Sequence, residues 1–257
     1  MSRCAVVALA CVTATGVVSA QQIQVTFDNL LPENGTAFTP VFVGLHDGTF
    51  DLFNPGEAVT SGLERVAELG ATDELTAEFN GSAGSIDGAT TGGGPVLGGQ
   101  SRSVVLDGGG LGAGGFLTFA TMVVPTNDLF IGNPNQTGIR VFDDAGEFVG
   151  PFTITIFGSQ VWDAGTEVND LDDGAAFLAG IAGTAGTDQG GTAQLFFNDP
   201  SAQSFIDGTI GRQTAPGFVV ASSFTELTPI AQIRVVPSPG AAALAATGLL
   251  LGVRRRR

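Results

Sequence analysis

Short runs of β-branched and aromatic residues, separated by clusters of Gly, Asn and Asp, are the feature that most constrains this fold. Glycine alone contributes 39 of the 257 residues. Strands need short apolar or alternating runs, and the turns between them need residues that tolerate unusual backbone angles. The pattern therefore predicts an all-β sandwich or barrel, and it disfavours a fold in which strands alternate with helices.

The strand predictions follow these runs, and two of them, 23–27 and 152–156, alternate apolar and polar residues as half-buried strands do. The predicted strands are Ile23–Phe27, Phe38–Gly44, Arg102–Leu106, Phe116–Val124, Leu129–Gly132, Gly138–Phe142, Phe152–Phe157, Ala193–Phe197, Val219–Leu227 and Ile230–Val235.

One stretch, Glu57–Phe79, has apolar residues near helical spacing. Gly70 stands where a helix stop belongs, and Thr72 starts a second short turn. We therefore expect one or two short helices in a long connection. The Gly-rich segments 81–99 and 108–115 are predicted to be flexible loops. Residues 110–115 also fit GxGxxG, but a strand follows where a dinucleotide site needs a helix, so a hairpin loop is predicted.

The N-terminus has the three parts of a secretory signal peptide. Arg3 precedes the apolar run Ala5–Val18, and the small residues Ser19 and Ala20 follow it. Residues 1–20 are therefore predicted to be removed, which leaves 21–236 as the folded domain. Both cysteines, Cys4 and Cys11, lie in the signal peptide, so no disulfide is expected in the exported protein.

The C-terminal segment 237–257 begins Pro-Ser-Pro, continues as a short apolar run and ends in Arg254–Arg257. The run is only marginally long enough for a hydrocarbon core of about 30 Å, and the arginines would hold its end in the cytoplasm. It resembles the PEP-CTERM sorting signal of Gram-negative exopolysaccharide producers, with Ser238 where that motif has Glu. The resemblance implies processing by an exosortase-type enzyme, or retention as an anchor, and places the domain at the cell surface or in an exopolysaccharide matrix. Membrane contact is expected only through this tail.

The charge balance narrows the possible partners. The formal net charge is −15, and all 25 acidic residues lie between Asp28 and Glu226, where only four arginines and no lysine accompany them. Such a surface repels phosphate backbones and argues against nucleic-acid binding. It suits divalent cations.

Catalysis by a nucleophile is disfavoured. His46 is the only histidine, the exported chain has no cysteine, and no GxSxG motif occurs. A polysaccharide hydrolase with paired carboxylates stays open as an alternative because acids are plentiful. One Trp and no Tyr offer few platforms for sugar rings, however.

The densest acidic stretch runs from Asp163 to Gly174. Clustered carboxylates repel one another unless water or a cation separates them, and calcium prefers six to eight oxygen ligands. The spacing does not fit an EF-hand. From these residues alone, a calcium-binding loop and a solvated acidic loop are both possible.

Several motifs in order resemble a spondin domain over roughly residues 22–235. The front half shows it in 38–47 (FTPVFVGLHD), 52–58 (LFNPGEA) and 61–70 (SGLERVAELG). Further motifs are 127–132 (NDLFIG), 161–167 (VWDAGTE) and the closing strand 229–235 (PIAQIRV). The segment 175–213 and the Gly-rich insertions do not match in detail.

The spondin resemblance implies a C2-like antiparallel β-sandwich with a calcium ion held by loops at one end. Carried over to this chain, it implies Asp128, Asp163 and Glu167 as calcium ligands, with Asn127 and Asp170 as weaker candidates. Animal members are matrix and adhesion proteins, so a non-catalytic surface module is expected here, with an exopolysaccharide or a cell-surface protein as partner. A structural envelope protein without a specific ligand is a further alternative. His46 is expected to pack or to cap a strand end.

Overall fold

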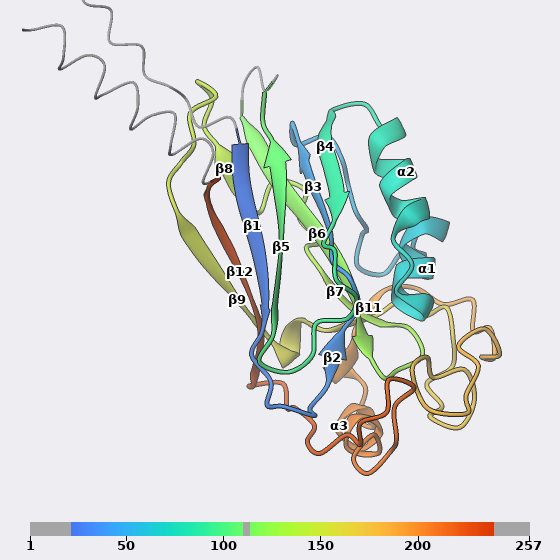
Figure 1. Ribbon diagram of the computed structural model, residues 1–257. Coiled ribbons are helices and arrows are strands. Elements are labelled where there is room, and N and C mark those ends of the chain that lie inside the picture. The colour runs from blue at the N-terminus through green and yellow to red at the C-terminus, as the bar shows by residue number, and fades with distance from the viewer. Residues whose placement is uncertain (1–21, 110–113, 239–257) are drawn as a thin grey trace, which may run out of the picture.

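The computed structural model describes residues 22–109 and 114–238 and shows two antiparallel sheets packed face to face (Figure 1). The predicted signal peptide, residues 110–113 of the GxGxxG run and the tail beyond Ser238 lie outside these residues. Within the two described ranges, no helix is long and apolar enough to cross a membrane.

The first sheet has the strand order β5-β1-β12-β9. Its strands are Ser101–Asp107 (β5), Gln22–Asn29 (β1), Pro229–Pro237 (β12) and Phe152–Phe157 (β9). Successive side chains of a strand point to opposite faces, so β1 buries Ile23, Val25 and Phe27 in the core. Gln24 and Asp28 lie on the other face. The alternation read from the sequence therefore fixes which face of this sheet is buried.

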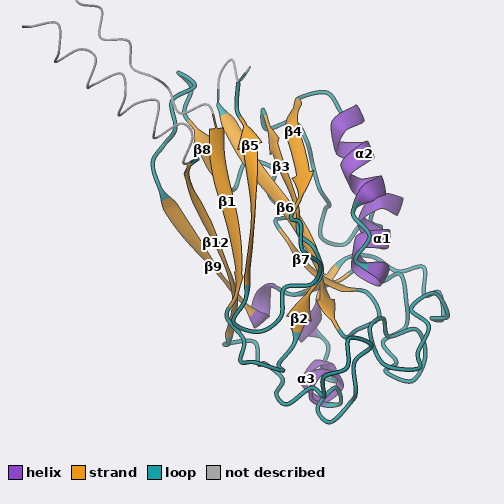
Figure 2. Ribbon diagram, in the orientation of Figure 1, coloured by secondary structure: helices purple, strands orange, loops and turns teal. Residues whose placement is uncertain are grey.

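The second sheet has the order β11-β10-β7-β6-β3-β4, and β2 and β8 both pair with β6. Its bounds are Gln194–Leu195 (β11), Trp162–Asp163 (β10), Leu129–Gly132 (β7), Gly115–Val124 (β6), Phe42–His46 (β3), Ser85–Thr90 (β4), Ala37–Phe38 (β2) and Arg140–Phe142 (β8). β6 is buried along almost its whole length. One side of this sheet packs on the first sheet, and two of the helices cover the other (Figure 2).

Two short helices cover that outer side, α1 (Ser61–Leu69) and α2 (Asp73–Gly81). Phe79 of α2 lies directly over Gly44 of β3 and its cross-strand neighbour Gly88 of β4. A Cβ at either glycine would lie within 2.7 Å of the Phe79 ring. The two glycines therefore allow α2 to approach the sheet closely.

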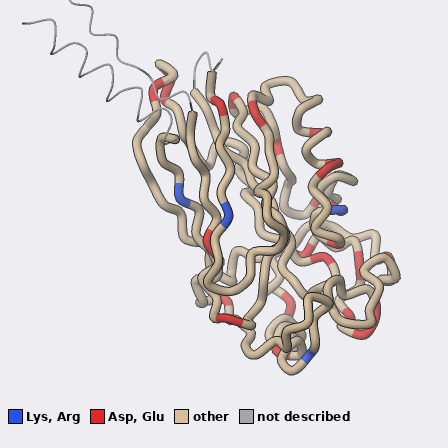
Figure 3. Tube along the Cα trace, viewed as in Figure 1, with Lys and Arg blue, Asp and Glu red and all other residues tan. Residues whose placement is uncertain are grey.

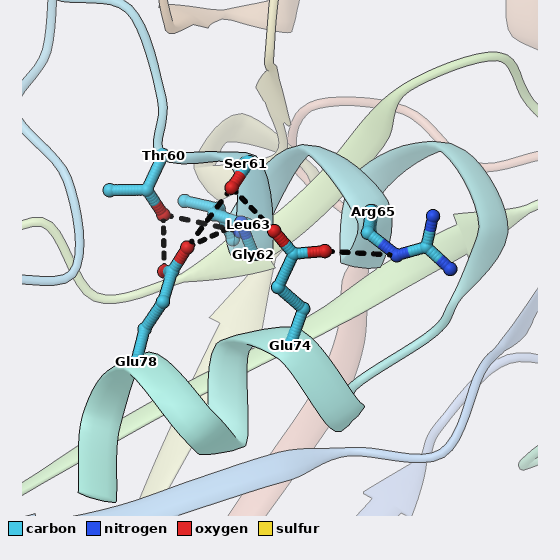
Figure 4. Close-up of polar contacts among 7 residues, drawn as sticks. All are labelled: Thr60, Ser61, Gly62, Leu63, Arg65, Glu74 and Glu78. Atoms are coloured by element: carbon cyan, nitrogen blue, oxygen red, sulfur yellow. Dashed lines mark hydrogen bonds and ion pairs between the residues drawn. The ribbon is translucent and has the colours of Figure 1, made fainter. Parts of the chain in front are cut away.

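The ends of α1 follow the capping signals in the sequence. The Thr60 hydroxyl accepts the N–H of Leu63, and Gly70 ends the helix in the left-handed conformation at φ 65°. Glu78 of α2 adds a second cap, because its carboxylate accepts the N–H of Gly62 and the Thr60 hydroxyl (Figure 4). The predicted helix stop at Gly70 is thus confirmed.

The lower end of the sandwich in Figure 1 consists mainly of irregular chain. Between β10 and β12 the only regular elements besides β11 are η2 (Phe196–Asn198) and α3 (Ala202–Asp207), and η1 (Gly158–Gln160) precedes β10. The loops from the sheets and these segments gather at the same end.

The all-β sandwich and most predicted strands are confirmed. The predicted strand Phe38–Gly44 is interrupted after Phe38: β2 pairs with β6 and β3 begins at Phe42, on the far side of Pro40, which has no N–H to donate. Ala193–Phe197 shrinks to β11. Val219–Leu227 is not a strand; it has only isolated backbone bridges, at Val219 and Ser222.

The Gly-rich segment 81–99 was expected to be a flexible loop, and the structure corrects this. Residues 85–90 form β4. Arg102 then holds the following turn, since its guanidinium donates to the carbonyl oxygens of Gly93 and Pro95 and to the side chain of Gln100. Pairing across the sheet and one arginine thus order a stretch that looks featureless in sequence.

β12 ends at Pro237, one residue beyond position 236, where the folded domain is predicted to end. Pro237 still pairs with Ile23 in β12, and the Ser238 N–H donates to the carbonyl oxygen of Gln22 at 2.9 Å. Proline is tolerated at a strand end, and Pro237 accordingly forms the last residue of β12.

Candidate cation site at the loop end of the sandwich

Asp128 is the most constrained acid of the molecule. It directly precedes β7, and its side chain is fully buried. Its Oδ2 accepts the N–H groups of Thr166 and Glu167 at 2.8 and 3.1 Å. Among the described residues its Oδ1 has no hydrogen-bond partner. A buried carboxylate oxygen without a partner lowers the stability of the fold. Protonation of the oxygen or a bound cation would remove this penalty.

Asp163 approaches Asp128 from the neighbouring strand. β10 pairs with β7 so that Asp163 lies opposite Leu129. Its oxygens accept the N–H of Gly165 at 2.7 Å and the amide of Asn169 at 2.5 Å. Gly165 turns the chain at φ 71°, and a Cβ there would lie 2.6 Å from the Thr192 nitrogen. The Asp-Ala-Gly-Thr sequence therefore forms a tight turn. This turn holds the Asp163 side chain on one side and packs against the backbone at Thr192 on the other.

Burial and proximity make this pair unfavourable when both acids are ionised. Burial, and then the charge of Asp163, raise the pKa of Asp128 to about 7. Burial likewise raises the pKa of Asp163. Near neutral pH the pair needs either a shared proton or a positive ion close by.

Glu167 contributes its backbone to this pair but directs its carboxylate elsewhere. It is 4% exposed, and in the described part of the chain its Oε2 has no hydrogen-bond partner. A Cβ at Gly186 would lie 2.3 Å from that carboxylate, so the glycine makes room for it. Burial, and then the charge of Glu68 on α1, raise the Glu167 pKa to about 7. Glu68 did not figure among the sequence candidates; its only signal was the Glu of the V-A-E run.

Asn127 and Asp170, the weaker candidates, hold the loop together. The Asn127 Oδ1 accepts the N–H of Asp170 at 3.0 Å, and its amide donates to the carbonyl oxygen of Asp173 at 2.7 Å. Asp170 itself accepts the N–H of Asp172. Their polar groups are thus largely occupied by contacts that position the loop against β7.

The fit of a cation can be judged from these contacts. Over residues 22–109 and 114–238, no group of three or more His, Cys, Asp or Glu side chains is arranged to hold a metal ion. The five candidates therefore do not form one cluster. Asp128 and Asp163 do come together, and a hard cation that completes its shell with carbonyl oxygens and water fits such a pair. Figure 3 shows further acids along the loops at this end.

His46 packs as expected. It is fully buried at the end of β3, and its Nδ1 accepts the Gly48 N–H at 3.1 Å. The rings of Phe50, Phe79 and Phe116 surround it. Burial lowers its pKa, so the ring is neutral at physiological pH. This environment is that of a core residue.

The architecture is an antiparallel β-sandwich with buried acids on the loops at one end. A family model described as Spondin_N matches residues 17–209, and the chain therefore belongs to the Spondin_N family. Spondin domains are extracellular and generally non-catalytic, which makes this an extracellular-type module. No curated protein sequence matches the chain.

Proposed function

We propose that this protein is a secreted, non-catalytic adhesion or extracellular-matrix module whose loop end binds calcium. The observation that carries the proposal is the Asp128–Asp163 pair: Asp128 is fully buried with one oxygen unpartnered among the described residues, and the half-buried Asp163 lies beside it at the end of β10. Calcium would replace the proton that the pair otherwise needs near neutral pH. Asp128 and Asp163 would hold the ion, and Glu167, through its N–H bond to Asp128, would position the loop around it.

The test is thermal melting of the protein with calcium and with excess chelator. A ligand that binds only the folded state stabilises it by about 2.7 kcal/mol at a hundred times its dissociation constant. Asp163→Asn should abolish this rise in the melting midpoint. Asp172→Asn is the matched control, because Asp172 is an exposed acid of the same segment that pairs with Arg212. An unchanged midpoint in wild type, or a loss only in Asp172→Asn, contradicts the proposed site.

A carboxylate-pair hydrolase has less support. A glycosidase acid must reach the bond that it cleaves. Asp128 is fully buried, and its Oδ2 accepts two backbone N–H groups. Asp128, one of the two acids, is therefore out of reach of a sugar chain.

Delivery is part of the proposal. We propose that 1–20 directs export and that the segment after Ser238 is a sorting or anchoring tail of the PEP-CTERM type, processed by an exosortase-type enzyme, in a bacterium. The final arginines suit this role because they resist translocation. Removing Arg254–Arg257 should shift the protein from the cell-surface fraction to the medium or leave it unprocessed. An unchanged distribution and an unchanged mass of the mature protein contradict this role.

A further inference from the structure

A surface hollow of about 440 Å³ lies at the loop end of the sandwich, apart from the acid pair. Three segments enclose it: residues 31–35 after β1, residues 97–100 before β5, and Phe218 in the loop that precedes β12. Its size falls within the range of small-molecule sites, about 300–1,000 Å³. Neither Asp128 nor Asp163 lines it, so the acid-pair proposal does not use it.

The rims of the hollow are held in place before any ligand arrives. The buried Asn29 donates to the carbonyl oxygens of Thr36 and Val96 and accepts the N–H of Leu31, so one side chain fixes both the 31–35 and the 97–100 rims. The third segment joins them through the Ala221 N–H, which donates to the Asn34 carbonyl oxygen at 2.7 Å. A rigid site loses less entropy on binding.

Phe218 is presented by a tight turn. Both the N–H and the hydroxyl of Thr214 donate to the Phe218 carbonyl oxygen, at 2.8 and 2.9 Å. The ring is half-buried and lines the hollow beside Leu97. An aromatic ring exposed to solvent on a fixed turn offers a flat apolar surface.

The polar side chains of the rim complement that ring. Asn34 is exposed and held at φ 59°, a conformation that asparagine tolerates better than most residues. Gln100 uses its Oε1 to accept from Arg102, which orients its amide group. Glu33 is the only charged residue of the lining, and the chain as a whole carries −15. An anionic ligand would be repelled, and a purely apolar one would leave the amides without partners.

We infer that this hollow is a binding site for a neutral saccharide, with the apolar face of a sugar ring on Phe218 and its hydroxyl groups on Asn34 and Gln100. A pyranose has both an apolar C–H face and a polar edge, which is the combination that this lining offers. The inference rests on the proposed role as a surface or matrix module and gives that module a ligand class.

The experiment is titration calorimetry of the purified protein with neutral oligosaccharides of glucose, mannose and galactose of two to six units. Phe218→Ala should weaken binding at least tenfold. Val219→Ala, a change at the neighbouring residue, which is 52% exposed and does not line the hollow, should leave it unchanged. Asn34→Gly keeps the backbone conformation, removes only the amide, and should weaken binding about fivefold. Melting midpoints check that each variant is folded.

Three outcomes would overturn the inference: no binding of any neutral oligosaccharide, equal binding by wild type and Phe218→Ala, or binding of polyuronates alone. Binding should also persist in Asp163→Asn with chelator present. If the sugar binds but calcium does not change the melting midpoint, the saccharide site is supported and the cation site is contradicted. If calcium raises the midpoint but no sugar binds, the cation site is supported and the saccharide site is contradicted.

Discussion

The N–H of Gly62, in the first turn of α1, donates a 2.8 Å hydrogen bond to a carboxylate oxygen of Glu78 in α2. A Cβ at Gly62 would lie 2.6 Å from that carboxylate, so the contact requires glycine. Figure 4 shows that the carboxylates of Glu78 and Glu74 accept hydrogen bonds from Thr60, Ser61 and Gly62. Glu74 also forms an ion pair with Arg65. Negative charge at a helix N-terminus is favourable, and here the neighbouring helix supplies it.

The first prediction concerns this contact. Gly62→Ala should destabilise the protein by about 1 kcal/mol, because Glu78 must move and leave the N–H of Gly62 without its partner. In a Glu78→Ala background the same substitution should instead stabilise by roughly 0.5–1 kcal/mol, since alanine then has only its higher helix propensity. Urea unfolding of the four proteins measures the reversal of sign. Gly81→Ala, at the end of α2 with nothing within 4 Å, is the control and should behave alike in both backgrounds.

The second prediction concerns pH in the absence of calcium. The pKa of both Asp128 and Glu167 is raised to about 7 by burial, against ordinary values of 3.8 and 4.5. The unfolded chain ionises first, so these groups reduce stability progressively as the pH rises from about 4 to about 7, and no further above that. Asp128→Asn should make this part of the profile less steep, because only the Glu167 contribution remains, measured as the free energy of unfolding in chelator. Saturating calcium should flatten it in wild type as well, and a profile insensitive to both contradicts the buried pair.

The third prediction concerns His46, for which stability falls as the pH decreases instead of as it rises. Burial lowers the pKa of His46 below 6.5, and the charge of the adjacent Asp47 only partly opposes this. Stability associated with His46 is therefore lost as the pH falls below about 6.5, because the unfolded chain takes up the proton first. His46→Asn keeps an acceptor for the Gly48 N–H but cannot be protonated. It should lower stability at pH 8 by about 1–3 kcal/mol through lost packing and should weaken the decline on the acid side.

Local signals in the sequence predicted the elements whose patterns are self-contained. The alternation of 23–27 and 152–156 and the helix stop at Gly70 are examples. Elements that depend on distant partners were missed or misplaced. β4 is polar and carries a glycine, and it is a strand because β3 pairs with it and Phe79 covers Gly88. Val219–Leu227 has strand-like residues but makes only isolated bridges, to Gln213 and Gly35.

In the candidate site, too, local motifs indicated some residues, and the contacts between distant segments could not be predicted. The W-D-A-G-T-E motif located Asp163, and the order of motifs located Asp128, because both lie at fixed offsets from paired strands. The sequence did not indicate that Glu68 would raise the pKa of Glu167, since α1 and the 164–193 loop meet only in the folded molecule. Asn127 is one of the two weaker candidate ligands, and the sequence did not reveal that its side chain positions the loop through Asp170 and Asp173.

The fourth prediction sets the end of the domain. A chain that ends at Ser238 should melt like the full-length protein. A chain that ends at Val236 loses the pairing of Ile23 with Pro237 and the Ser238 hydrogen bond to Gln22. It should be less stable by about 1 kcal/mol in urea unfolding. Equal midpoints for the two truncated chains would show that β12 gains nothing from its last two residues.

Trp162 precedes Asp163 in β10, packs edge-on against Phe53 and is 7% exposed. It is the only tryptophan, and the chain has no tyrosine. Fluorescence excited at wavelengths that phenylalanine does not absorb therefore comes from a single indole, one residue from Asp163. Rearrangement of the Asp163 loop and global unfolding can therefore both be followed through one native fluorophore, without a label or an engineered residue, and the same signal would test for cation binding.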